Sequence, residues 1–141
     1  MIILLHKSKN RILLEINYDS DISRLQIKNI ELKNCYHISG IDIVDGELIN
    51  CNIKDCDIYD SKIEKSTINK CNLFGYGNCK DSKIKDSFVS RNIKLKDCNV
   101  SGQLGKMGGS MKGGSLKNTT VITSMAEIGD DVEKTNVNEI Q

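Results

Sequence analysis

The sequence contains no proline and no tryptophan, and two phenylalanines and four tyrosines are its only aromatic residues. A chain without proline can keep an uninterrupted ladder of backbone hydrogen bonds, because proline lacks the N–H donor that a central strand requires. With so few rings, the core must be built mainly from aliphatic side chains. The 141 residues are enough for one domain of ordinary size.

The sequence also lacks a large excess of charge of either sign and any long hydrophobic run. Its formal net charge is +1, which argues against a general nucleic-acid binder and against an acidic mimic of DNA. The apolar run 2–5 is far shorter than a signal-peptide core or the roughly 20 residues that span a bilayer. We therefore expect a protein made in the cytoplasm, with no export signal, no membrane partner and no nucleic-acid partner.

Aliphatic residues recur every five positions, a period that belongs to neither a helix nor a strand. The segment 51–60 shows the unit, with Cys-Asn-Ile-Lys-Asp followed by Cys-Asp-Ile-Tyr-Asp. Single extra residues interrupt this register three times. The residues expected to form the repeat core are Ile38, Ile43, Leu48, Ile53, Ile58, Ile63, Ile68, Leu73, Ile84, Val89, Leu95 and Val100.

Two further columns follow the same period. We call each recurring aliphatic residue the centre of its repeat. Two residues before each centre the side chain is often small or carries a thiol, as at Cys51, Ser61 and Cys71. Two residues after each centre, twelve of sixteen positions hold Asn, Asp or Gly, which tolerate turn conformations. We expect short strands that point the centre and the small residue inward, joined by turns at the Asn, Asp and Gly positions.

This pattern resembles the pentapeptide-repeat family, whose loose consensus is a small residue, a polar residue, a central Leu or Phe, and two polar residues. The match covers 20–102, with Ile in place of Leu or Phe and with Cys and Ser in place of Ala. The resemblance implies an all-β fold, a right-handed quadrilateral β-helix of four to five coils. Residues 20 or 21 apart would then be in contact, so that Leu32, Ile53 and Leu73 would stack.

The flanks of the repeat region are expected to differ from it. Apolar segments at 1–5 and 11–18 surround a polar stretch, which predicts an N-terminal β-hairpin cap over 1–19. The Gly-rich segment 103–128 has two open interpretations. Met111, Leu116 and Val121 continue the five-residue period and favour a further coil, whereas the Gly and Ser content favours a flexible linker. The residues 129–141 are expected to form a polar tail.

No pattern in the chain predicts catalysis, a metal or a cofactor. The six Cys, at 35, 51, 56, 71, 79 and 98, follow the repeat and include no Cys-x-x-Cys pair, so we expect reduced, packed thiols. A four-sided coil would stack Cys51 on Cys71, as two thiols rather than a disulfide. Only His6 and His37 could serve as a base, and a phosphate-binding loop is absent. We therefore expect no enzymatic activity.

The surface is expected to carry the function. Tyr59, Phe74 and Phe88 occupy outward or corner positions, where large rings are candidate protein contacts. On the outward columns Lys62 and Lys83 are expected to stack in a mixed ladder with some basic excess, whose plainest role is solubility.

We expect a non-enzymatic structural or adaptor protein, a rigid rod that joins larger protein partners or copies of itself. Short Ile-, Lys- and Asn-rich repeat proteins with a Gly-rich C-terminal segment look like minor virion proteins from the head, neck or tail of tailed bacteriophages, which would place the protein in a virion.

The alternative is a regulator that mimics DNA on a type II topoisomerase, as other pentapeptide-repeat proteins do. The 13 basic and 12 acidic residues of 20–102 weigh against this alternative, because such mimicry needs an acidic field.

Overall fold

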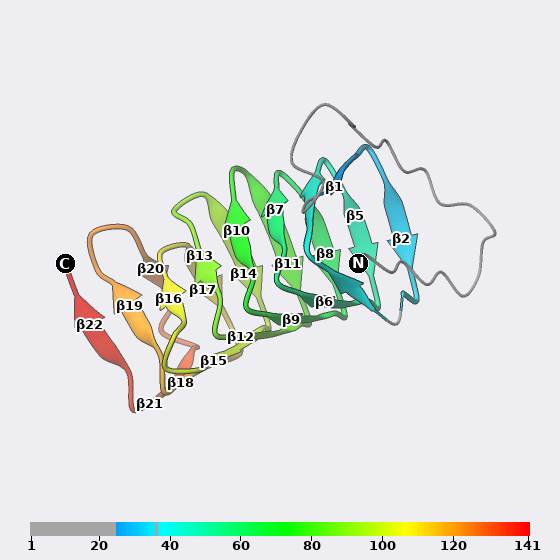
Figure 1. The fold of residues 1–141 in the computed structure, drawn as a ribbon. Helices are drawn as coiled ribbons and strands as arrows, with labels where there is room; N and C mark the ends of the chain where they lie inside the picture. Colours follow the sequence, from blue (N-terminus) through cyan, green and yellow to red (C-terminus); the bar gives the residue numbers. More distant parts are fainter. Residues whose placement is uncertain (1–24, 36) are drawn as a thin grey trace.

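The chain folds into a β-solenoid built from short parallel strands. The computed structural model describes residues 25–35 and 37–141, and in them 22 strands and no helix are found. They wind into about seven coils stacked along one axis, and not into the expected four to five (Figure 1). The all-β solenoid expected from the sequence is confirmed, and its right-handed sense stays a prediction. Within the described residues there is thus no helix long and apolar enough to cross a membrane.

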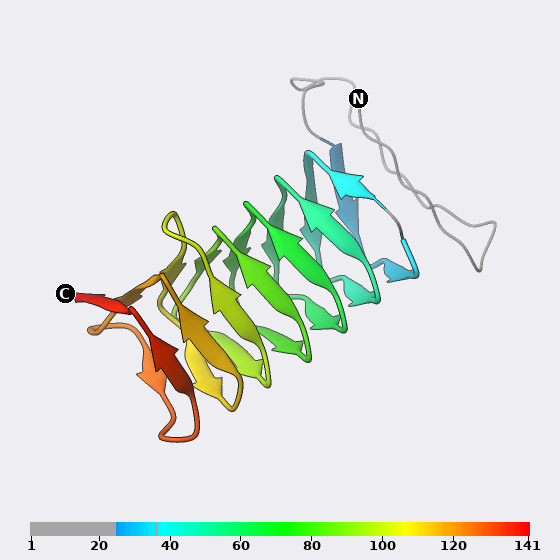
Figure 2. The same cartoon turned by 90° about the horizontal axis from the view of Figure 1, so that it is seen from below.

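The strands assemble into three parallel sheets, one for each side of the solenoid (Figure 2). Sheet 1 contains β1 (Leu25–Lys28), β4 (Ile41–Val44), β7 (Asp57–Tyr59), β10 (Asn72–Phe74), β13 (Phe88–Val89), β16 (Lys106–Met107), β19 (Thr120–Ile122) and β22 (Asn138–Ile140). Sheet 2 contains β2 (Glu31–Lys33), β5 (Glu47–Ile49), β8 (Lys62–Glu64), β11 (Gly77–Lys80), β14 (Ile93–Lys96), β17 (Ser110–Lys112) and β20 (Glu127–Ile128). Sheet 3 contains β3 (Ile38–Ser39), β6 (Asn52–Lys54), β9 (Thr67–Asn69), β12 (Lys83–Lys85), β15 (Asn99–Ser101), β18 (Ser115–Lys117) and β21 (Glu133–Thr135).

The quadrilateral coil expected from the resemblance is wrong, because each coil has three sides. Ile43 pairs with Ile58, 15 residues later, and Leu73 pairs with Val89, 16 residues later. The expected contacts between residues 20 or 21 apart, including Leu32 on Ile53, are therefore absent from the strand register. The five-residue period sets the length of a side, whereas the bend at each corner decides how many sides close a coil.

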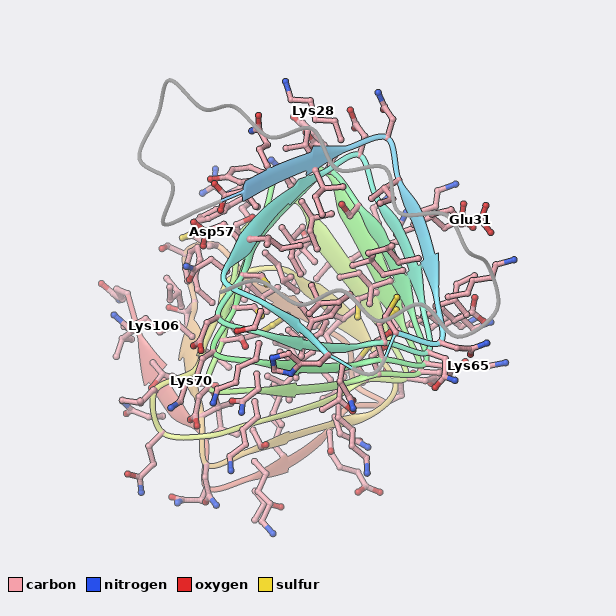
Figure 3. All side chains as sticks on the ribbon, turned by 45° about the vertical axis from the view of Figure 1, so that its right-hand side comes forward. Lys28, Glu31, Asp57, Lys65, Lys70 and Lys106 are labelled. Carbon is pink, nitrogen blue, oxygen red and sulfur yellow. The ribbon has the colours of Figure 1, made fainter. Side chains whose placement is uncertain are left out.

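Each corner is made by a residue with a left-handed backbone. All twelve Asn, Asp and Gly residues of the expected turn column have positive φ, from 49° at Asp86 to 104° at Gly102. Lys65 and Lys70 occupy the same column with φ of 51° and 53°, and both lie at corners of the solenoid (Figure 3). Gly, Asn and Asp are the residues that adopt this conformation at least cost, which explains why the sequence concentrates them there.

The interior is filled by the central column and the small column of the repeat. The twelve expected core residues are all buried, none more than 4% exposed. The small column satisfies the backbone at the corners, because its Ser hydroxyls are buried and bonded on both sides. Ser66 Oγ donates to the carbonyl oxygen of Glu64 at 2.9 Å and accepts the N–H of Cys51 at 3.0 Å. Ser82 and Ser87 repeat this arrangement in the next coil.

The solenoid continues through the Gly-rich segment and beyond it. Met111, Leu116 and Val121 are buried, in β17, β18 and β19. The expectation of a tail over 129–141 is wrong, because β21 and β22 pair with β18 and β19. Backbone pairing needs no apolar side chain, so polar residues can form these strands. The expected hairpin cap over 1–19 lies outside the described residues.

Replacing Lys65 by Asn is predicted to stabilise the fold. A left-handed backbone costs a residue with a long side chain roughly 1–2 kcal/mol, and Asn tolerates it better. We expect Lys65→Asn to raise the free energy of unfolding by about 0.5–1 kcal/mol in urea denaturation. Lys62→Asn removes the same charge from the middle of a side, where Asn is a poor strand residue, and should give no gain. Equal effects of the two substitutions would contradict this account of the corners.

Candidate functional site

Three aromatic rings form a ladder on the outward face of sheet 1. Tyr59 and Phe74 are register partners in β7 and β10, and their ring centroids lie 5.2 Å apart with an interplanar angle of 27°. Phe88, in β13, continues the ladder at 5.9 Å from Phe74 with a 52° tilt. In-register stacking brings Tyr59 and Phe74 together, because both follow the centre of their side. Phe88 instead precedes the centre of its side, pairs in register with Asn72 and reaches Phe74 as a diagonal neighbour.

The aromatic ladder, defined as Tyr59, Phe74 and Phe88, is half-buried. The rings shield one another, and Val44, the register partner of Tyr59, extends the apolar strip towards β4. Beside Tyr59 and Phe74, Asn72 donates to Asp57 Oδ1 at 2.8 Å, so the adjoining column is polar in β7 and β10 before it continues with Phe88 in β13. The result is a narrow apolar strip with a hydrogen-bonded border, which can hold another apolar surface.

The thiols lie inside the solenoid, not on its surface (Figure 3). The expected stacking of Cys51 on Cys71 is wrong, since a coil of three sides places them at different corners. Asn52 N donates to the Cys35 carbonyl oxygen at 3.1 Å, and Asn72 N donates to the Cys56 carbonyl oxygen at 2.9 Å. The stacked pairs are therefore Cys35 with Cys51 and Cys56 with Cys71. All six Cys are buried and unbridged.

The surroundings of four of these thiols favour the protonated form, whereas a hydrogen bond with Cys79 lowers the pKa of Cys98. Burial raises the pKa of Cys35 to about 12 and also raises the pKa of Cys51. A hydrogen bond with Cys56, together with burial, raises the pKa of Cys71, and a hydrogen bond with Cys98, together with burial, raises that of Cys79. Since the thiolate is the reactive form, these environments favour packing over nucleophilic chemistry.

Other groups that could support chemistry are scattered. His37 is exposed, and His6 lies outside the described residues. Across 25–35 and 37–141, His, Cys, Asp and Glu side chains form no group of three or more suited to a metal ion.

The thiol positions predict a contrast between two conservative substitutions. Cys71 belongs to the small column, and its thiol faces the Asn69 carbonyl oxygen at 3.3 Å just as Ser87 Oγ faces that of Lys85 at 2.8 Å. Cys79 belongs to the central column, between Ile63 and Leu95. We expect Cys71→Ser to change the free energy of unfolding by less than about 1 kcal/mol and Cys79→Ser to lower it by about 1–3 kcal/mol. A larger loss at Cys71 than at Cys79, measured by urea denaturation, would show that the columns are misassigned.

A groove of about 690 Å³ lies along the corner between sheets 1 and 2. Its lining includes Tyr76, Arg91 and Lys94 on one side and Thr123, Ser124, Met125 and Glu127 on the other. Arg91 Nη2 donates to the Ser124 carbonyl oxygen at 3.4 Å and so joins the two sides. Tyr76 is 78% exposed, the largest exposed fraction among the big apolar side chains of the described residues.

The groove arises from unequal corner lengths. The connection between β16 and β17 is only Gly108-Gly109, whereas the coils on either side use residues 90–92 and 123–126. A short corner between two longer ones leaves a hollow. Glycine is required in the short corner, because a Cβ on Gly108 would lie 2.9 Å from the Val89 carbonyl oxygen.

The sequence placed Tyr59, Phe74 and Phe88 outside the core but did not bring them together, because the ladder depends on the length of a coil. The groove was missed altogether. The sequence nevertheless contained an indication of the groove. The number of residues between successive centres falls between Met107 and Met111 and rises between Val121 and Ile128. No protein-family model matches the chain, and no curated protein matches it either.

Proposed function

We propose that the protein is a non-enzymatic structural or adaptor module that assembles with larger protein partners through the aromatic ladder. The observation that carries this proposal is the stack of Tyr59, Phe74 and Phe88 on an outward sheet face, with centroids 5.2 and 5.9 Å apart. Large rings on a solvent-facing sheet are typical anchors of protein interfaces. Three sheets that share one core supply a rigid support for them.

We further propose that the assembly is a virion, with the protein as a minor head, neck or tail component of a tailed bacteriophage. The composition and layout of the chain support this setting, as does its five-residue period, which links it to pentapeptide-repeat proteins. A solenoid suits such a role because coil-to-coil hydrogen bonding makes it stiff along its axis.

The distribution of acidic residues does not favour the alternative of a DNA-mimicking topoisomerase regulator. Such a mimic needs a continuous acidic face. Here Asp45, Asp55, Asp60, Asp81, Asp86 and Asp97 lie at the positive-φ corners. On the outward faces of the sides, acidic residues such as Glu47 and Glu64 are interspersed with lysines such as Lys62 and Lys80. A DNA-gyrase supercoiling assay separates the two functions, and inhibition at modest protein concentration would favour the mimic.

Replacing Phe74 by Ser tests the assembly proposal. Phe74 stacks on two rings, so we expect its loss to lower the free energy of unfolding by about 1–2 kcal/mol and to leave the solenoid folded. Binding to the partner assembly should weaken about tenfold or more, measured as the fraction of protein that sediments with large particles from its source.

Leu104→Ser provides the matched control, because Leu104 is apolar, 74% exposed and outside the ladder, in a turn where its N–H donates to Asp86 Oδ1 at 3.3 Å. This variant should sediment like the wild type. If Phe74→Ser also sediments like the wild type, or if the wild-type protein is found only as a free monomer in its source, the proposed function is wrong.

A further inference from the structure

An uninterrupted column of lysines runs along the outward face of sheet 2. Lys80 is the register partner of Lys96, and Lys96 is the register partner of Lys112. Successive strands of a sheet are about 4.8 Å apart, so the three ammonium groups are attached at neighbouring points. Like charges directly opposite each other across strands destabilise a sheet. The column, defined as Lys80, Lys96 and Lys112, therefore carries a cost that the fold alone does not explain.

Sheet 3 shows how the same solenoid avoids this cost. There Lys54, Lys85 and Lys117 occupy the equivalent column, but Asn69 and Ser101 separate them. Alternation doubles the spacing between the charges. The expected stacking of Lys62 on Lys83 is wrong, because Lys62 pairs with Asn78 and Lys83 pairs with Thr67 and Asn99.

Within residues 25–35 and 37–141, no carboxylate forms an ion pair with the lysine column. The one ion pair found in the described part of the chain joins Lys33 to Glu31, at 2.8 Å. Glu64 borders the column as the register partner of Lys80, and Asp81 and Asp97 follow it at the next corner, yet none of them forms an ion pair with it. The near-neutral net charge of the chain thus conceals a local excess of positive charge on this face.

The groove adjoins this face and adds to it. Lys94 belongs both to the outward face of sheet 2 and to the lining of the groove, and Arg91 lies beside it. One residue separates Lys94 from Lys96, which places the groove edge about 7 Å from the lysine column. The exposed ring of Tyr76 stands at the same edge. A flat ring, two cations and a row of lysines are therefore presented side by side.

The loop that carries Tyr76 is held in place by the coil before it. Tyr76 N donates to Asp60 Oδ1 at 2.8 Å. Because the backbone of Tyr76 is anchored while its ring is exposed, the ring is positioned without being covered. An exposed, anchored ring is suited to stacking on a planar group.

We propose that the face formed by β11, β14 and β17, together with the groove, binds single-stranded nucleic acid. The phosphates contact Lys80, Lys96 and Lys112, with Arg91 and Lys94 at the groove, and a base stacks on Tyr76. Grooves that bind single strands combine positive charge along the backbone with aromatic platforms for the bases. An acidic protein surface would match the lysines but would leave the exposed ring and the hollow without a role. This site is separate from the aromatic ladder on sheet 1 and does not depend on the proposed assembly function.

Fluorescence anisotropy with labelled single-stranded DNA and RNA of about 15 nucleotides tests the site. The triple variant Lys80→Gln/Lys96→Gln/Lys112→Gln should weaken binding at least about tenfold, and the dependence of log Kd on log salt should fall by about 2, the value for three lost phosphate contacts to a single strand. The matched control Lys54→Gln/Lys85→Gln/Lys117→Gln removes the same charge from sheet 3 and should weaken binding less than about threefold.

A second pair of variants tests the stacked base. Tyr76→Ala should weaken binding about tenfold, while Tyr76→Phe, which keeps the ring, should bind like the wild type. Circular-dichroism melting of every variant confirms that the solenoid is intact. A duplex of the same sequence should compete poorly, because its bases are not free to stack on the ring.

Three outcomes would overturn the proposal. The first is no binding of either oligonucleotide by the wild type at about 50 mM salt, where phosphate contacts are strong. The second is equal weakening by the two triple variants, which would show attraction to net charge alone. The third is equal competition by poly-glutamate with no effect of Tyr76→Ala, which would assign the face to an acidic protein partner. Each outcome leaves the sedimentation result for Phe74→Ser unchanged, so failure here and failure of the assembly proposal are distinguishable.

Discussion

The rest of the structure depends on backbone hydrogen bonding between successive coils. Lys62 N donates to the Gly46 carbonyl oxygen at 2.9 Å, Asn72 N does the same to Cys56, and equivalent bonds follow along the solenoid. These bonds hold each residue above its equivalent in the previous coil. Any residue type favoured at one position is consequently repeated as a column, which is how the aliphatic core, the Ser bonds and the thiol pairs arise.

The same constraint produces both proposed binding surfaces, with opposite energetic consequences. Stacking aromatic side chains is favourable, so Tyr59, Phe74 and Phe88 stabilise one another in the isolated chain. Stacking lysines is unfavourable, so Lys80, Lys96 and Lys112 gain most when an anion is bound. The aromatic ladder is thus favourable without a partner, whereas the lysine column becomes favourable only with one.

Departures from the repeat are confined to corners, where they change the surface without disturbing the core. The extra residue near Tyr76 is accommodated by Asp60 of the previous coil, and the shortened corner at Gly108 opens the groove. Between these corners the central residues stay buried, as Leu95 and Met111 do. Strand pairing therefore tolerates insertions and deletions of one or two residues, provided that they fall where the backbone already turns.

The sequence by itself determined the side of a coil: a buried centre such as Ile53, a small inward residue such as Cys51 and a left-handed corner such as Asp55. These features depend on local preferences, namely strand alternation and the residues that accept positive φ, and they could be predicted. The number of sides could not, because it depends on how sharply every corner bends when the coils pack together. Because the coil has three sides rather than four, Leu32 pairs with Leu48 and not with Ile53. For the same reason Tyr59 pairs with Phe74. Only the tertiary structure, through that closure, decided which residues share a column and therefore which surfaces the protein presents.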